Sequence, residues 1–299
     1  MEQNGTYSFL YTEDDESVKK ESMFRITMKR LLKNKMAVLG GIILIIIVLA
    51  SLLAPWISPY DYTYQELYNV NAGPSAEHWL GTDSLGRDIL SRLLHGGRNS
   101  LTIGIVSTLL SALAGTALGA TAGYYGGAYD NVVMRILDVF RAVPSMLLAI
   151  AISATLGTGY INCIIALTIS GIPGSARMAR ASCMGVRNQD YIEAAVSINA
   201  SEPRIIFKHV LMNALAPIFV MATMGVASNI LMSASLSFVG LGVQPPEAEW
   251  GAMVSAGRNV LRYYPHICIS PAIIIMLTVL SINMLGDGLR DALDPRLKQ

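Results

Sequence analysis

The stretch "MAVLGGIILIIIVLASLLA", residues 36–54, contains no charged side chain. As an α-helix it would be about 28 Å long, close to the roughly 30 Å hydrocarbon core of a bilayer. Backbone that crosses a membrane must satisfy its hydrogen bonds internally, and an uninterrupted apolar run does so as a helix. We therefore expect a first transmembrane helix over these residues.

The composition of the whole chain supports a membrane protein. Of its 299 residues, 53% are hydrophobic and only 14% are charged, against about 25% charged in an average soluble domain. Further intervals without Asp, Glu, Lys or Arg cover residues 99–129, 142–176, 209–246 and 263–286. The interval 142–176 is too long for one helix, and the paired glycines of "LGTGY", residues 156–160, favour a turn within it. The sequence thus predicts an all-α, polytopic protein with six transmembrane helices.

The basic residues indicate the orientation. With the N-terminus inside, 17 of the 22 Lys and Arg residues fall in inside segments, including Arg135 and Arg141 in a predicted loop. The five on the outside are Arg87, Arg92, Arg98, Arg258 and Arg262. This bias predicts that both termini are cytoplasmic. Residues 1–35 carry charges of both signs before the first apolar run, so we expect a retained tail and not a cleaved signal peptide.

The second predicted span has small residues at every fourth position. They are Ser107, Ser111, Gly115, Gly119 and Gly123. This spacing places them on one helix face, where another helix backbone can approach closely. The partner helix could belong to the same bundle or to a second membrane subunit.

The predicted spans have no Asp, Glu, Lys or Arg, which disfavours a proton-driven carrier because such carriers usually need ionisable groups in the membrane. Sodium sites can still be built from carbonyls and hydroxyls. No glycine is followed by lysine, so the phosphate-binding GxxxxGK[ST] loop of an ATPase is absent from the sequence. Energy for uphill transport would therefore have to come from another chain.

Neither the cysteines nor the histidines form a recognisable site. Cys163, Cys183 and Cys268 lack paired or metal-like spacing, and His78, His95, His209 and His266 are scattered through different segments. We interpret the cysteines as packing residues and the histidines as ordinary polar positions. No catalytic residue, metal site or cofactor is expected in this chain.

A charged, helix-patterned segment, "YIEAAVSINASEPRIIFKHVLMNALAPI", residues 191–218, interrupts the apolar sequence. Tyr191, Ala195 and Ile198 are spaced as one apolar stripe of a short helix, with Glu193 on another face. Asn199 follows, and Asn tolerates the left-handed conformation of a helix end. The spacing predicts a helix that ends at Asn199.

A second short helix is predicted after this break. Ser201 suits an N-cap and Pro203 a first helical turn. Arg204 and Lys208 then share one side, whereas Ile206 and Val210 share another. From these patterns alone, the pair could be amphipathic helices that lie along the membrane surface.

This segment resembles the EAA loop of binding-protein-dependent ABC importer permeases, with Glu193, Ala194 and Ala195 at the triplet that gives the loop its name. In that family the loop forms a coupling helix that docks on a cytoplasmic ATPase. Two positions depart from the family pattern: Asn199 replaces a glycine, and Met212 replaces a proline. The resemblance implies an ATPase-coupling surface formed by Glu193, Ala194, Ala195, Asn199, Arg204 and Lys208.

Three further segments, residues 81–101, 235–253 and 277–297, are similar to the dipeptide, oligopeptide and nickel permease family, and to its C-type subunit in particular. The resemblance extends from about Met28 to the end of the chain. Each motif also has a structural interpretation. Asp88 and Arg92, for example, are spaced as an i,i+4 ion pair that would stabilise an outside helix.

The resemblance implies the type I ABC importer transmembrane-domain fold and a division of the chain into segments. These are a cytoplasmic tail over 1–35, the first transmembrane helix over 36–54, an extracytoplasmic segment over 55–98, a five-helix permease core over 99–290 with its coupling loop at about 187–212, and a cytoplasmic tail over 291–299. The location expected is a prokaryotic cytoplasmic membrane.

The partners that the resemblance implies are a homologous second permease, two cytoplasmic ATP-binding subunits that hold ATP and Mg²⁺, and an extracytoplasmic substrate-binding protein. Membrane lipid surrounds the chain, and no nucleic-acid partner is expected. The function implied is import of di- or oligopeptides by alternating access. Two alternatives stay open: import of nickel or another metal chelate, and a stand-alone secondary carrier or channel.

Overall fold

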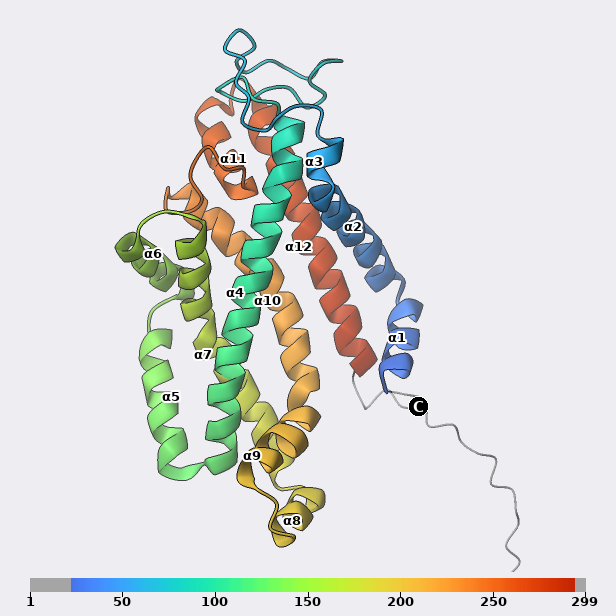
Figure 1. The fold of residues 1–299 in the computed structure, drawn as a ribbon, viewed down its shortest axis with the longest axis vertical. Helices are drawn as coiled ribbons and strands as arrows, with labels where there is room; N and C mark the ends of the chain where they lie inside the picture. Colours follow the sequence, from blue (N-terminus) through green and yellow to red (C-terminus); the bar gives the residue numbers. More distant parts are fainter. Residues whose placement is uncertain (1–22, 294–299) are drawn as a thin grey trace, which may run out of the picture.

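The computed structural model describes residues 23–293 as an elongated helical bundle (Figure 1). Within this range every regular element is a helix, and one isolated bridge joins Thr82 to Asp88. Residues 1–22 and 294–299, which include most of each predicted tail, lie outside the described residues. The elements are α1 Met23–Lys33, α2 Lys35–Leu52, α3 Ala54–Ile57, α4 Ile89–Tyr125, α5 Gly127–Arg141, α6 Ser145–Leu156, α7 Tyr160–Arg187, α8 Asp190–Ser197, α9 Glu202–Arg204, the π-helical η1 Ile205–Leu211, α10 Met212–Phe238, α11 Trp250–Gly257, the 3₁₀ turn η2 Arg258–Val260, and α12 Pro265–Leu293.

Five helical segments in the described range are long and apolar enough to cross a membrane, and a bent pair of helices raises the number to six if it counts as one broken span. The five are α2, α4, α7, the continuous segment Glu202–Phe238 and α12. The predicted first span at residues 36–54 coincides with α2 except for its last two residues. The predicted number of six depends on the bent pair α5–α6.

The pair α5–α6 corrects the expected inside loop. The predicted break at residues 156–160 is confirmed, because α6 ends at Leu156 and α7 begins at Tyr160. However, the 12 residues of α6 extend only about 18 Å, which is too short for a span. The residues expected to form a loop with Arg135 and Arg141 instead form α5, which meets α6 at a bend of 82°. Pro144 explains the bend, because a proline disfavours helical backbone at the preceding residue.

Ion pairs explain why this charged segment is a helix beside the bundle. Asp130 of α5 accepts two hydrogen bonds of 2.5 Å from the guanidinium of Arg180 in α7. Asp138 of α5 pairs with Arg177, also in α7. The two aspartates of α5 are thus paired with arginines of a neighbouring helix, a long-range arrangement that the local sequence pattern does not reveal.

The ridge of small residues on α4 faces α7 within the same bundle. A methyl group built at Gly119 would lie 2.1 Å from the carbonyl oxygen of Ala176, and one at Gly115 would lie 2.5 Å from Cβ of Ser175. Both distances are far below van der Waals contact. The predicted close approach is confirmed, and the partner helix belongs to this chain.

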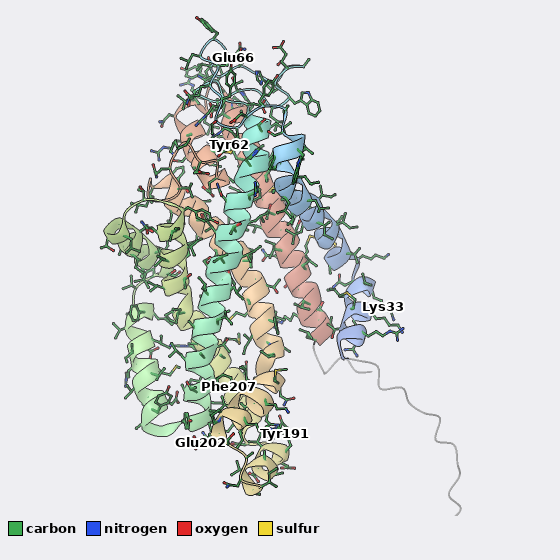
Figure 2. The ribbon with its side chains drawn as sticks, viewed as in Figure 1. Lys33, Tyr62, Glu66, Tyr191, Glu202 and Phe207 are labelled. Carbon is green, nitrogen blue, oxygen red and sulfur yellow. The ribbon has the colours of Figure 1, made fainter. Side chains whose placement is uncertain are left out.

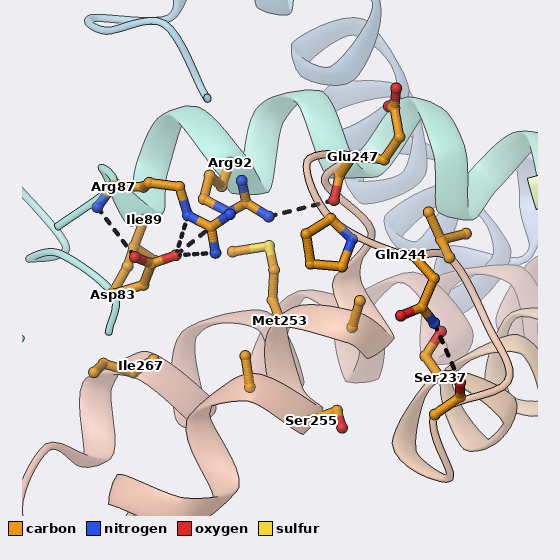
Figure 3. Close-up of a pocket in the computed structure, with 15 residues that line it drawn as sticks. Asp83, Arg87, Ile89, Arg92, Ser237, Gln244, Glu247, Met253, Ser255 and Ile267 are labelled. Carbon is orange, nitrogen blue, oxygen red and sulfur yellow. Dashed lines mark hydrogen bonds and ion pairs between the residues drawn. The ribbon is translucent and has the colours of Figure 1, made fainter. Parts of the chain in front are cut away.

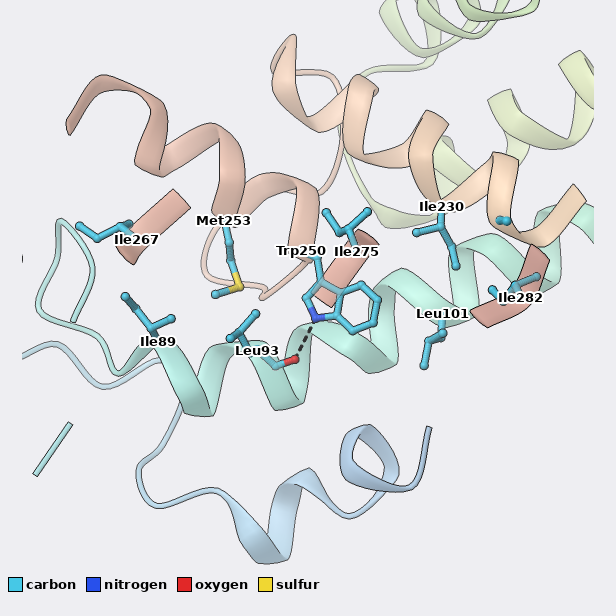
Figure 4. Packing of buried hydrophobic residues seen from close by; sticks show 10 residues of the cluster. Ile89, Leu93, Leu101, Ile230, Trp250, Met253, Ile267, Ile275 and Ile282 are labelled. Atoms are coloured by element: carbon cyan, nitrogen blue, oxygen red, sulfur yellow. Dashed lines mark hydrogen bonds between the residues drawn. The ribbon is translucent and has the colours of Figure 1, made fainter. Parts of the chain in front are cut away.

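At the other end of α4, Trp250 anchors α11 in the main apolar core (Figure 4). Its side chain is fully buried, and its indole N–H donates to the carbonyl oxygen of Leu93 at 2.9 Å. Ile230 of α10 and Ile275 of α12 belong to the same cluster. This core fixes α4, α10, α11 and α12 relative to one another.

The expected ion pair between Asp88 and Arg92 is wrong. Asp88 is the N-cap of α4, and its carboxylate accepts from the backbone N–H of Ser91 at 2.7 Å and contacts His78 Nδ1 at 2.9 Å. The cap satisfies a backbone donor that has no partner within the helix. The guanidinium of Arg92 instead contacts loop carbonyls, including that of Tyr62 at 3.0 Å.

Replacing Gly119 with alanine is expected to destabilise the protein by about 1–3 kcal/mol, because the added methyl group would displace backbone that cannot move freely. Gly185→Ala is the matched control, since Gly185 lies in α7 and a methyl group placed there would meet nothing within 4 Å. Helix propensity predicts that this control is neutral or stabilising. Thermal unfolding of the purified protein in detergent measures both, and equal stability of the two variants would contradict the packing role of the ridge.

Candidate functional site: the coupling segment and a membrane cavity

The segment formed by α8, α9 and η1 lies at one end of the bundle, opposite the loop between α3 and α4 (Figure 1). In Figure 2, Tyr191, Glu202 and Phe207 mark this end, whereas Tyr62 and Glu66 mark the opposite end. These two groups of residues therefore lie toward opposite ends of the molecule.

The predicted helix end at Asn199 is confirmed. Asn199 has a φ of 57°, in the left-handed region. Its N–H donates to the carbonyl of Val196 at 2.9 Å, and that of Ala200 donates to Ala195 at 3.1 Å. These two bonds form a Schellman motif, which satisfies carbonyls at a helix C-terminus. Asn199 thus provides the left-handed residue of the turn that ends α8.

The buried face of α8 differs from the predicted stripe. Ile192 and Ala195 are buried in a cluster that includes Ile205 of η1. Tyr191 and Ile198, which were expected beside Ala195, are 45% and 80% exposed. The stripe is wrong because α8 packs on η1 through Ile192, so two of the three predicted apolar residues lie on the outer surface.

The second half of the segment is not a separate short helix. Backbone at Ser201 is extended, and the chain then runs through α9, η1 and α10 as one helical segment from Glu202 to Phe238. The predicted faces are confirmed: Ile206 and Val210 are buried, and Arg204 and Lys208 are exposed. The predicted coupling segment is therefore continuous with a helix that is long and apolar enough to cross a membrane.

A groove of about 410 Å³ opens between α8 and η1. We call it the coupling groove; it is lined by Tyr191, Ala194, Ala195, Ile198, Ala200, Arg204 and His209. Of the six predicted coupling residues, it brings together Ala194, Ala195 and Arg204. Glu193, Asn199 and Lys208 are exposed, whereas Ala195 is only 8% exposed and packs on the buried side of α8.

One polar contact ties this end to α4. The hydroxyl of Tyr125 donates to a carboxylate oxygen of Glu202 at 2.9 Å. The pair joins the last residue of α4 to the first residue of α9. Neither residue is predicted from the sequence, because a contact between positions so far apart leaves no local signal.

A second candidate site is a cavity of about 340 Å³ among α4, α7 and α10. All of the residues that line it are uncharged: Thr108, Ser111, Ala112, Ser145, Ser170, Gly171, Gly174, Ser175, Met178, Ile218, Met221, Ala222, Met224, Gly225, Ser228, Asn229 and Met232. The amide of Asn229 donates to the hydroxyl of Thr108 at 2.8 Å. We call this space the membrane cavity. It offers hydroxyl, amide and thioether groups to a solute, and no charge.

Comparison with known proteins identifies relatives over nearly the whole chain. It is 45% identical over 285 residues to the glutathione transport system permease protein GsiD of Pectobacterium atrosepticum, covering 95% of this chain and 94% of the relative. The GsiD protein of Escherichia coli O6:K15:H31 is 46% identical over 271 residues, covering 90% of this chain and 89% of the relative.

Solved structures show the same fold. A chain of the MetNI methionine ABC transporter in an inward-facing conformation has a TM-score of 0.56 and 21% identity, covering 68% of this chain and 97% of that chain. An amino acid ABC transporter has a TM-score of 0.52 and 18% identity, covering 65% of this chain and 90% of that chain.

Two family descriptions match the sequence. Residues 22–74 match the N-terminal TM domain of oligopeptide transport permease C, and residues 115–299 match the inner membrane component of binding-protein-dependent transport systems. The type I importer fold, the multi-pass helices and the 45% identity agree with both matches. The chain therefore belongs to the binding-protein-dependent ABC importer permeases, as a C-type inner-membrane subunit of the dipeptide, oligopeptide and nickel family.

Proposed function

We propose that this chain is the permease subunit of an ATP-driven importer of short peptides, including glutathione. The observation that carries the proposal is 45% identity to a glutathione permease across 95% of the chain. The membrane cavity is compatible with such a solute, since its hydroxyl and amide groups can bond to peptide groups.

The assembly that we propose contains a homologous second permease, two ATP-binding subunits and an extracytoplasmic substrate-binding protein. ATP and Mg²⁺ belong to the ATP-binding subunits, and both termini of this chain lie in the cytoplasm. The distribution of Lys and Arg supports this orientation. In this proposed orientation, α8 and the coupling groove lie in the cytoplasm, on the same side as the ATP-binding subunits.

The contacts of the coupling segment support a route for mechanical coupling. When an ATP-binding subunit displaces α8, Ile192 and Ala195 transmit the motion to η1, because these residues pack together. The helical backbone carries the motion on into α10, and the bond between Tyr125 and Glu202 carries it into α4. Both long helices line the membrane cavity, so their movement changes its shape.

The alternatives are less well supported than peptide import. The resemblance to glutathione permeases favours a peptide cargo over a metal chelate. Membership of the binding-protein-dependent family argues against a stand-alone carrier or channel. Uptake of peptide by this chain alone in liposomes, without ATP-binding subunits, would contradict the proposal.

Charge reversal by Glu193→Lys together with Ala194→Gln is expected to reduce ATP-dependent peptide uptake at least about tenfold, which corresponds to about 1.4 kcal/mol of lost docking energy. Both residues are exposed, so the fold should be retained. Glu77→Lys makes the same charge change at an exposed position in the loop before α4 and should leave uptake unchanged. Uptake into proteoliposomes containing the complete importer, together with the ATPase rate, measures the coupling. Normal uptake by the double variant would rule out this docking surface.

The positive φ of Asn199 leads to a prediction with two variants. Asn199→Gly should keep coupling intact, because glycine adopts this conformation without strain. Asn199→Val should impair it, since left-handed backbone costs roughly 1–2 kcal/mol at an L-residue and is worst for β-branched side chains. Peptide-dependent ATPase activity of the two complexes tests this order, and equal activity of both would count against a role for the turn.

The membrane cavity is expected to be reachable by water during transport. Ser228→Cys, which lines the cavity, should react with a membrane-impermeant thiol reagent more than about tenfold faster than Ser233→Cys, because reaction needs an accessible thiolate. Ser233 lies in the same helix and is fully buried. Labelling is measured in a background without Cys163, Cys183 and Cys268. Equal labelling of both positions would exclude this cavity as the solute path.

A further inference from the structure

A separate pocket of about 210 Å³ lies at the opposite end of the molecule from the coupling segment. It is bounded by the start of α4, the loop after α10, α11 and the start of α12 (Figure 3). We call it the outer pocket. Its rim includes the exposed residues Gly240 and Gln244, whereas its floor is formed by buried residues such as Ile89 and Met253. A ligand that enters would therefore be largely removed from water.

Two arginines and one carboxylate meet on the floor of the outer pocket. Arg87 and Arg92 are both buried, and both approach the same carboxylate oxygen of Asp83. Asp83 Oδ2 lies 2.7 Å from both Nε and Nη2 of Arg87. Its Oδ1 accepts the backbone N–H groups of Leu85 and Arg87. Both carboxylate oxygens of Asp83 are thus already bonded, one to the Arg87 side chain and the other to backbone N–H groups of the adjoining turn.

Arg92 is left with an unused donor. Its Nη atoms donate to the carbonyls of Tyr62, Pro246 and Glu247 at 3.0–3.5 Å. Its Nε is 3.6 Å from Asp83, and this buried N–H has no hydrogen-bond partner within residues 23–293. The side chain is only 4% exposed. A buried guanidinium normally has all of its N–H groups paired, so this donor points to a missing acceptor.

The neighbouring acids do not supply that acceptor. The carboxylate of Glu247 extends away from the guanidinium groups in Figure 3 and accepts from Asn99 at 3.3 Å. Glu249 accepts from Ser100 and Ser237 at 3.0 and 2.8 Å. Among the described residues, Asp83 is therefore the carboxylate that both guanidinium groups of the pocket share.

We propose that the outer pocket binds the terminal carboxylate of the incoming peptide. The Nε–H of Arg92, which makes no hydrogen bond within the described residues, supplies a charge-assisted hydrogen bond to the peptide carboxylate, beside a second guanidinium that shares Asp83 with it. Ile89, Met253 and Ile267 provide an apolar wall for the adjoining part of the peptide. The volume is below the roughly 300–1,000 Å³ typical of complete ligand sites. The pocket therefore holds one end of the peptide.

The position of the pocket along α10 supports the substrate as the ligand. Ser237 lines the outer pocket, and Met232 of the same helix lines the membrane cavity. Five helical residues rise about 7.5 Å. A peptide held by its carboxylate is thus close to the cavity that it would enter next. This inference rests on the peptide import proposed above.

The test introduces a carboxylate into the pocket by substituting a residue of the protein itself. Ser255 lines the pocket and is half-buried, so Ser255→Glu adds a competing carboxylate, whereas Ser255→Gln adds almost the same volume without charge. Arg98→Gln removes an exposed positive charge from the same end of α4 and serves as a second control. Each variant is assembled with its second permease, ATP-binding subunits and binding protein in proteoliposomes.

The probes are glutathione and its C-terminal glycine amide, and the readout is the ratio of their uptake rates at subsaturating concentration. We expect Ser255→Glu to lower the acid-to-amide ratio about tenfold relative to Ser255→Gln, the effect of losing one charge-assisted hydrogen bond. The Arg98→Gln control should keep the wild-type ratio. Dividing the acid rate by the amide rate corrects for differences between variants in the amount of folded complex.

Three outcomes would overturn the inference. An unchanged ratio in Ser255→Glu shows that the pocket does not recognise the carboxylate. Equal loss of acid and amide uptake, with weaker docking of the binding protein in a direct affinity measurement, assigns the pocket to an acidic side chain of that protein. If the wild-type complex imports neither probe nor any other short peptide, the proposed peptide import is wrong. This result comes from the wild type alone, so it is distinguishable from a failure of the pocket, which only the variants test.

Discussion

The close approach of α4 to α7 is the contact on which the rest of the bundle depends. At Gly119 the two backbones are so near that not even a methyl group fits between them. Lipid chains are as apolar as the helix surfaces, so membrane helices gain little by hiding apolar area from lipid and rely instead on close packing. Glycine at every fourth position provides such packing over several turns of α4. With α7 held in this way, α10 can close the membrane cavity on the remaining side.

The two longest helical segments connect the two ends of the molecule. Both α4 and the segment Glu202–Phe238 contain 37 residues, or about 55 Å of helix, and therefore extend well beyond the roughly 30 Å hydrocarbon core. Their outer ends are fixed by Trp250 and by the buried ion pairs near Asp83. At the coupling end, the cluster around Ile192 and Ala195 is small and lies beneath exposed side chains. We infer that the outer end is the more rigid one, and that displacement of α8 moves the helices about that fixed end.

The features predicted correctly from the sequence are those encoded over a few neighbouring residues. The charge-free windows, the glycine spacing of α4 and the turn at Asn199 each depend on local composition or local backbone chemistry. The wrong predictions concern features that depend on contacts with other parts of the fold. Helix α5 depends on arginines of α7, Asp88 bonds to His78 instead of Arg92, and Ile198 is exposed because α8 packs through Ile192. The coupling groove and both cavities also combine residues distant in sequence, so their positions could not be predicted without the fold.

The chemistry of the two cavities indicates that the outer pocket and the membrane cavity would bind a solute with different strengths. A transport site must bind its solute well enough to admit it and weakly enough to release it. Hydroxyl, amide and thioether groups of the membrane cavity suit the second requirement, because neutral hydrogen bonds exchange readily with those of water. A buried guanidinium such as Arg92 suits the first, because it binds a carboxylate more strongly than a neutral donor does. In the peptide importer proposed above, charge recognition at the outer end and an uncharged membrane cavity would let the peptide be captured once and then pass inward without a second strong site to hold it.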